Sequence, residues 1–171
     1  MTIKKNKIVI FTDLDGSILH RDTFKFDQIK DYIKKLINSG IHIIPNSSKT
    51  ESEIIEFNQD LGENLAYISE NGSVINNLNL LNSNFPNKII LSREKEELVE
   101  IFKNNVPENL QSKCKFISNL NKKDQTNIFG LNDTKLKNAL DRKYTEPFLF
   151  EGSKNEKKDL TKILKKNSLT I

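Results

Sequence analysis

The sequence predicts an α/β fold, with a parallel-sheet core over residues 1–76 and an α+β module over residues 77–171. Three observations support this prediction. Short apolar runs alternate with helical segments in the first part, which is the pattern of strand–helix–strand units. Polar residues follow each of these runs directly, where parallel sheets bind ligands. After Asn76 the chain becomes rich in Asn, and the candidate elements become shorter.

The first strand candidate is an apolar run that ends in two carboxylates. Ile8 to Phe11 carry only apolar side chains, so the run predicts a strand that is buried on both faces. Asp13 and Asp15 follow, and acids two residues apart on an extended backbone point the same way. Like charges this close need a cation or a proton between them, and hard oxygen ligands favour Mg²⁺. Taken alone, Asp-x-Asp-Gly fits an Asx-turn equally well.

A helix and a second strand follow the first. Asp27 is expected to cap the helix, with Phe26 as its hydrophobic staple, and apolar residues recur at helical spacing up to Ile37. Residues 41–45 predict a second buried strand. Since a helix connects the two strands, they should run parallel with a right-handed crossover.

The second strand ends in polar residues that include Ser47 and Lys49. Thr50 and Glu53 have the spacing of a capping box, which predicts that a helix begins here. Gly62 is expected to end this helix.

Residues 65–68 predict a third strand, followed by a turn that contains Glu70 and Asn71. Residues 73–75 then form the return arm of a hairpin. Three successive strands therefore deliver polar residues at their carboxyl ends. Turn chemistry alone does not explain this repetition.

The second module is expected to mix short strands and helices. Pro147 favours an edge or a bulge for its last strand. Ser92 is expected to cap the first helix, and Ser153 with Glu156 forms a capping box for the last one. The strand candidates are residues 88–91, 113–117 and 144–150, and the middle helices are residues 124–129 and 134–142.

The strand-end residues suit phosphoryl transfer, which needs positioned charges and a metal more than covalent machinery. Asp13 could attack phosphorus and form an aspartyl-phosphate. Asp15 could protonate the leaving oxygen and then activate water. The Ser47 hydroxyl could bind a phosphoryl oxygen, and Lys49 could offset its charge. Alone, Ser47 is more often a capping hydroxyl and Lys49 a solvated charge, so the prediction depends on the whole set.

Composition narrows the class of protein. The formal net charge is +4, but the lysines are scattered among acids, which favours solvated faces over a nucleic-acid surface. No apolar run is long enough to span a bilayer, and Asp13 and Asp15 interrupt the run that follows the basic residues 1–7, so no secretory signal is predicted. The single Cys114 excludes an intrachain disulfide. A cytoplasmic protein is expected.

Taken together, the motifs resemble those of haloacid-dehalogenase-type phosphatases with a large α/β cap. The resemblance is carried by Asp13-Leu14-Asp15-Gly16-Ser17, Ser47-Ser48-Lys49-Thr50 and Glu70-Asn71-Gly72. The second motif, together with Arg142-Lys143-Tyr144-Thr145-Glu146-Pro147-Phe148, is similar to the mannosyl-3-phosphoglycerate phosphatase family. That family usually carries Thr where Ser17 stands, and the hydroxyl is retained.

The resemblance implies a Rossmannoid parallel-sheet core, here partial, with an inserted α+β cap. It implies that Asp13 is the nucleophile and Asp15 the general acid/base. Mg²⁺ would be bound by the Asp13 carboxylate and the Asp15 backbone carbonyl, and Ser47 and Lys49 would bind the phosphoryl group. In the cap, the candidates for reading the sugar and glycerate are Arg142, Thr145 and Glu146. For this last segment, a plain helix end with an edge strand explains the sequence about as well.

The chain departs from the family pattern after Phe150. The family continues into a second part of the core, which supplies a lysine and a Gly-Asp-x-x-Asn-Asp-type metal loop, and no residues of this sequence match either. The sequence is therefore expected to hold the nucleophile half of a site, to need a C-terminal partner chain if the enzyme is split, and to leave a sheet edge exposed.

Three interpretations remain open. The first is a phosphatase of mannosyl-3-phosphoglycerate, or of a related sugar phosphate such as glucosyl-3-phosphoglycerate or sucrose phosphate. The second is a non-catalytic binding or interaction protein that keeps a phosphate-binding remnant of the fold. The third is an incomplete record of a longer chain.

Overall fold

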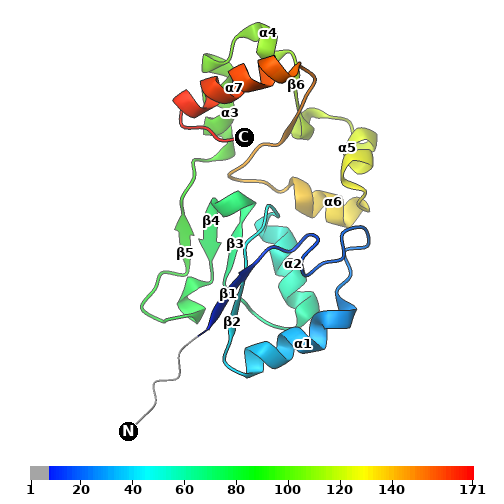
Figure 1. The fold of residues 1–171 in the computed structure, drawn as a ribbon, viewed down its shortest axis with the longest axis vertical. Helices are drawn as coiled ribbons and strands as arrows, with labels where there is room; N and C mark the ends of the chain where they lie inside the picture. The colour runs from blue at the N-terminus through cyan, green and yellow to red at the C-terminus, as the bar shows by residue number, and fades with distance from the viewer. Residues whose placement is uncertain (1–7) are drawn as a thin grey trace. The chain divides into compact units, whose positions relative to one another are not determined.

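The computed structural model describes residues 8–171, so the basic segment 1–7, used above in predicting that there is no secretory signal, lies outside the described residues. The chain forms two compact units, Met1–Leu91 and Ser92–Ile171 (Figure 1). Figure 1 shows the first unit in blue to green and the second in green to red. None of the helices within residues 8–171 is long and apolar enough to cross a membrane.

The first unit contains a strand–helix–strand unit followed by a three-stranded antiparallel sheet. Strand β1 pairs in parallel with β2, with Thr12 opposite Pro45 at their carboxyl ends, as the connecting helix predicts. A single parallel bridge between Asn46 and Ile68 links the end of β2 to β3. The elements are β1 (Val9–Thr12), α1 (Asp27–Asn38), β2 (His42–Pro45), α2 (Glu51–Leu61), β3 (Tyr67–Ser69), β4 (Val74–Asn76) and β5 (Lys88–Ile90).

The core of this unit lies between the two helices and strands β2 and β3. Ile54 and Leu61 of α2 are fully buried, and Ile33 of α1 packs with them. The capping box predicted at Thr50 and Glu53 is present, and the αL residue Gly62 ends α2 as expected. The hairpin is confirmed as well, since β3 pairs antiparallel with β4.

Strand β1 corrects one expectation. The apolar run was predicted to be buried on both faces, yet Val9 is 43% exposed and Phe11 is 60% exposed. Within the described residues, β1 pairs with β2 alone, so one of its edges is free. The apolar run predicts a strand, but the burial of that strand also requires neighbouring elements that cover it.

Two helix starts also differ from the predictions. Phe26, not Asp27, occupies the N-cap position of α1, and its side chain makes no capping hydrogen bond. Helix α3 begins at Lys95 after the N-cap Glu94, so Ser92 does not cap it. The Ser92 hydroxyl donates instead to the Tyr144 carbonyl at 3.4 Å.

The second unit is an α+β fold around a two-stranded antiparallel sheet. Leu160 of α7 is fully buried, and the rings of Phe102, Phe116 and Phe148 pack edge-on or tilted against one another. The capping box at Ser153 and Glu156 is present. The elements are α3 (Lys95–Asn105), α4 (Glu108–Gln111), β6 (Cys114–Phe116), α5 (Lys122–Phe129), α6 (Asp133–Leu140), β7 (Phe148–Phe150) and α7 (Lys154–Lys166).

The boundary between the units lies at Leu91, whereas the sequence suggested a change after Asn76. The reason is that β5 pairs with β4, which holds residues 77–91 in the first unit. The assignment of the two parts as enzyme core and cap stays a proposal.

Candidate functional site

Asp13 and Asp15 lie on a tight loop that begins where β1 ends. Leu14 between them is fully buried, so its side chain anchors the loop in the core while both acids stay exposed. The Leu14 backbone N–H donates to Asp13 Oδ1 at 2.7 Å. Gly16 takes a positive φ of 75°, which a residue with a side chain rarely adopts, and turns the chain back. The strand ends at Thr12, so the two acids do not continue one extended segment.

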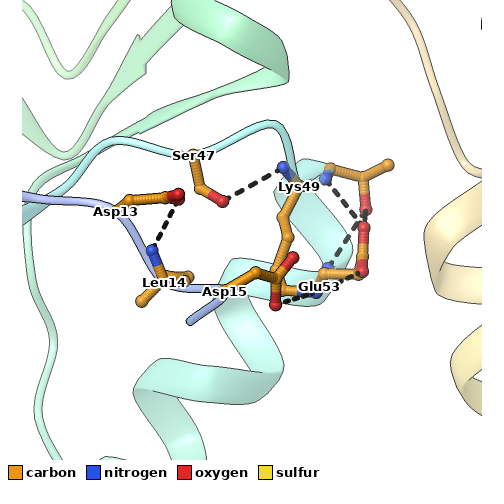
Figure 2. Close-up of polar contacts among 7 residues, drawn as sticks. Asp13, Leu14, Asp15, Ser47, Lys49 and Glu53 are labelled. Atoms are coloured by element: carbon orange, nitrogen blue, oxygen red, sulfur yellow. Dashed lines mark hydrogen bonds and ion pairs between the residues drawn. The ribbon is translucent and has the colours of Figure 1, made fainter. Parts of the chain in front are cut away.

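Ser47 and Lys49 lie on the next loop, which follows β2. The Asn46 N–H donates to the Thr12 carbonyl at 2.8 Å, and this bond joins the ends of β1 and β2. Ser47 is buried, and its hydroxyl oxygen accepts the Lys49 backbone N–H at 3.3 Å. Figure 2 shows the Asp13 side chain pointing toward Ser47 and the Ser47 hydroxyl pointing toward the Lys49 backbone nitrogen.

The ammonium group of Lys49 makes two ion pairs, and the pair with Asp15 joins the two loops. Its Nζ lies 3.2 Å from Asp15 Oδ1 and 3.1 Å from Glu53 Oε1 (Figure 2). Burial by itself lowers the pKa of Lys49, but the Glu53 and Asp15 carboxylates outweigh that effect and hold the pKa above its ordinary value. Lys49 is therefore a fixed positive charge among carboxylates.

The loop after β3 is hydrogen-bonded to the Ser47–Lys49 loop. Glu70 is buried, and both Glu70 and Asn71 have positive φ angles, 48° and 59°. The Glu70 N–H donates to the Lys49 carbonyl at 2.9 Å, and the Asn71 N–H donates to the Ser47 carbonyl at 3.1 Å. Backbone strain of this kind persists only where the surrounding structure holds it. The three strand ends predicted to carry polar residues are thus tied together by backbone bonds.

The candidates in the second unit form a separate polar cluster. Arg142 Nη1 donates to Thr145 Oγ1 at 2.9 Å. The Glu146 side chain is only 7% exposed, and its Oε2 lies 3.9 Å from Lys95 Nζ. Its other oxygen, Oε1, accepts no hydrogen bond from any residue that the structure describes.

The acids of the first loop suit a hard divalent cation. Residues 8–171 contain no group of three or more His, Cys, Asp or Glu side chains arranged to hold a metal ion. Mg²⁺ is commonly bound by one or two carboxylates, with water and substrate phosphate completing the shell. Asp13 and Asp15 meet that requirement in type and number.

Two residues near Lys49 were not among the sequence candidates. Glu53 was predicted only as a capping residue, although its spacing of four from Lys49 on a helix start was a usable signal. The Phe24 ring lies under the Lys49 ammonium, 5.2 Å from Nζ to the ring centroid. No local pattern predicts that contact.

Comparison with protein families and curated proteins gives consistent matches. A family model described as haloacid dehalogenase-like hydrolase matches residues 10–170. A Persephonella marina protein named glucosyl-3-phosphoglycerate/mannosyl-3-phosphoglycerate phosphatase is 27% identical over 174 residues, which covers 96% of this chain and 62% of that protein. A Methanococcoides burtonii protein of the same name is 36% identical over 69 residues, covering 40% of this chain and 25% of its own. The chain thus spans about three fifths of the length of the first of these relatives.

Solved structures share the fold at low sequence identity. A structure whose description concerns a trigonal-bipyramidal intermediate in a phosphoryl-transfer superfamily has a TM-score of 0.57 and 13% identity, covering 92% of this chain and 63% of its own. A haloacid dehalogenase-like hydrolase from B. subtilis has a TM-score of 0.52 and 16% identity, covering 77% and 49%. These likenesses confirm the predicted α/β fold.

Proposed function

Because this chain belongs to the haloacid dehalogenase-like hydrolases, as its motifs predicted, we propose that it is a magnesium-dependent phosphatase acting on a sugar phosphate. The observation that carries the proposal is the Lys49 ammonium, which lies 3.2 Å from Asp15 and joins the loops after β1 and β2. A half-buried cation beside the exposed Asp15, on the loops at the carboxyl ends of two parallel strands, suits a phosphoryl group.

The proposed reaction has two steps at phosphorus. An Asp13 carboxylate oxygen attacks phosphorus, the bond between phosphorus and the ester oxygen of the substrate breaks, and Asp15 gives its proton to that leaving oxygen. Asp15 then takes a proton from water as the water oxygen attacks phosphorus. The bond between Asp13 and phosphorus breaks, which releases inorganic phosphate and restores both carboxyl groups.

The other residues of the site bind and orient the phosphoryl group. The Ser47 hydroxyl donates to a phosphoryl oxygen, and the Lys49 ammonium balances its charge. Mg²⁺ would be held by the Asp13 carboxylate and the Asp15 backbone carbonyl, and when bound it supplies positive charge against the phosphoryl oxygens.

Mannosyl-3-phosphoglycerate is the proposed substrate, with glucosyl-3-phosphoglycerate as its close alternative. The name of the Persephonella marina relative, which this chain matches over 96% of its residues, supports this choice. In the second unit, the Arg142 guanidinium suits a glycerate carboxylate, and Thr145 and Glu146 suit sugar hydroxyls.

We also propose that further polypeptide, in a longer chain or a separate partner, packs against β1. This proposal is supported by two observations: among residues 8–171, β1 pairs with β2 alone, and Val9 and Phe11 of β1 are exposed. Apolar strands with an unpaired edge readily accept another strand.

The test measures phosphate release from mannosyl-3-phosphoglycerate, with and without Mg²⁺, by the chain and by its Asp13→Asn variant. The chain is assayed alone and with a polypeptide covering the part of the Persephonella marina protein that this chain does not match. The proposal predicts release that requires Mg²⁺ and is lost in Asp13→Asn. Phosphate binding without any release, from this or other sugar phosphates, even with the added polypeptide, would favour the non-catalytic binding protein.

A further inference from the structure

We infer that Glu53 and Phe24 are positioning residues that hold the Lys49 ammonium beside Asp15, so that Lys49 meets a phosphoryl group from a fixed place. The inference deepens the proposed function and rests on it for the role of Lys49. The placement of Lys49 itself can be tested without any turnover.

The two carboxylate oxygens of Glu53 have different partners: one caps α2, and the other pairs with Lys49. Its Oε2 accepts the Thr50 backbone N–H at 3.0 Å and the Thr50 hydroxyl at 3.2 Å, which completes the capping box of α2. Its Oε1 is left for Lys49 Nζ at 3.1 Å. The side chains of Lys49 and Glu53 are 12% and 11% exposed, so this pair is shielded from solvent far more than a surface ion pair. A capping box requires only the bond from Oε2 to Thr50, and not the ion pair with Lys49.

Phe24 holds the ammonium from another side. Its ring centroid lies 5.2 Å from Lys49 Nζ, which is within the range of a cation–π contact. The ring comes from the loop between β1 and α1, and therefore from a different part of the chain than Glu53. Three groups from two segments, Asp15 and Phe24 from the connection between β1 and α1 and Glu53 from α2, thus contact one ammonium.

The backbone of Phe24 is strained, which indicates that the fold holds its ring in place against a conformational energy cost. Its φ is 55°, a value that is an outlier for a bulky residue. The loop is closed by backbone bonds from Phe24 N–H to the His20 carbonyl at 2.8 Å and from His20 N–H to the Lys25 carbonyl at 2.9 Å. Strained residues gather at functional sites, where the surrounding structure over-determines them.

The alternative is that Glu53 serves only the helix cap, and one substitution separates the two roles. Gln also completes a capping box, so Glu53→Gln keeps the cap and removes the negative charge facing Lys49. The chain offers a matched control in the second unit. Glu156 caps α7 through Oε2 in the same way and pairs with Lys113 through Oε1, so Glu156→Gln makes the same change in the other unit.

The first measurement is the NMR shift of the Lys49 ε-methylene protons in the full chain. An aromatic ring under the ammonium shifts these protons upfield. The shift is expected in the wild type and in Glu156→Gln, and it is expected to be lost in Glu53→Gln because the ammonium leaves the ring. An unchanged shift in Glu53→Gln would overturn the inference, whether or not the chain is a phosphatase.

The second measurement is the affinity for inorganic phosphate in a double-mutant cycle with Lys49→Met. Glu53→Gln is expected to weaken binding about tenfold and Phe24→Leu about threefold, and neither should weaken it further once Lys49 is Met. Equal losses with and without Lys49 would contradict the inference. If the wild type binds no phosphate even with the polypeptide of the activity assay added, the proposed function fails, and the proton shift still decides the placement of Lys49.

Discussion

Two adjacent isoleucines of α2 provide a direct test of how the helix that carries Glu53 is packed. Ile54 is fully buried, whereas its neighbour Ile55 is 41% exposed. Both are substituted by Ala, so helix propensity changes equally in the two variants and cancels in the comparison. The difference in stability then reports burial alone.

The expected cost is much larger at Ile54. Ile→Ala removes about three methylene equivalents at about 0.8 kcal/mol each, or about 2.4 kcal/mol when the side chain is fully buried. An unfilled cavity adds about 1 kcal/mol, for a total of about 3.4 kcal/mol. At Ile55, about three fifths of the transfer free energy applies and solvent fills the space, which gives about 1.4 kcal/mol.

Urea unfolding followed by far-UV circular dichroism measures both free energies, since the chain has no Trp to report by fluorescence. Ile54→Ala should lower the free energy of unfolding by about 2 kcal/mol more than Ile55→Ala. Equal losses in the two variants would refute the packing of α2 described above.

Three further changes have defined outcomes. Phe11→Lys should reduce self-association of the chain in sedimentation experiments. Phe11 is 60% exposed, or about 120 Å² of a side chain of about 200 Å², so burying this area in a contact is worth about 3 kcal/mol. Unchanged association would show that β1 is not a site of self-association. Thr50→Ala should cost about 1 kcal/mol in urea unfolding through loss of the α2 cap while Thr50→Ser costs less, and equal costs would show that the capping hydroxyl is unimportant. Hydrogen bonds from Lys113 and Ser153 lower the pKa of Glu156 to about 2, so the ionised carboxylate stabilises the fold above its unfolded pKa near 4.5, and this stabilisation is lost as the pH falls toward 2. The stability of Glu156→Gln should therefore fall less between these pH values than that of the wild type. Identical acid unfolding curves for the two proteins would contradict this role of Glu156.

Local signals in the sequence predicted the two capping boxes correctly, although the single caps expected at Asp27 and Ser92 were wrong. The capping boxes at Thr50–Glu53 and Ser153–Glu156 need only residues three apart, and both are present. The parallel pairing of β1 with β2 followed from the helix between them. Non-local features were less accessible. The apolar run of β1 does not reveal whether a neighbour covers it, so its burial was predicted incorrectly.

The candidate site shows the same division. Asp13, Asp15, Ser47 and Lys49 were predicted as site residues because each follows a strand end, and their roles stay predictions; the ion pair between Lys49 and Asp15 was not foreseen. The second role of Glu53 was hidden behind its role as a cap. Phe24 lacked any signal because its positive φ comes from the closure of the loop between β1 and α1.

In the proposed reaction, Asp13 becomes covalently phosphorylated. The chain is mixed with Mg²⁺ and with mannosyl-3-phosphoglycerate that carries a labelled phosphoryl group. The mixture also contains the added polypeptide of the activity assay. The reaction is quenched in acid within its first turnover, and the peptides are analysed by mass spectrometry. We expect one labelled phosphoryl group on Asp13 in the wild type, and none in Asp13→Asn. Phosphate release without a label on Asp13, or equal labelling of the Asp13→Asn variant, would contradict it.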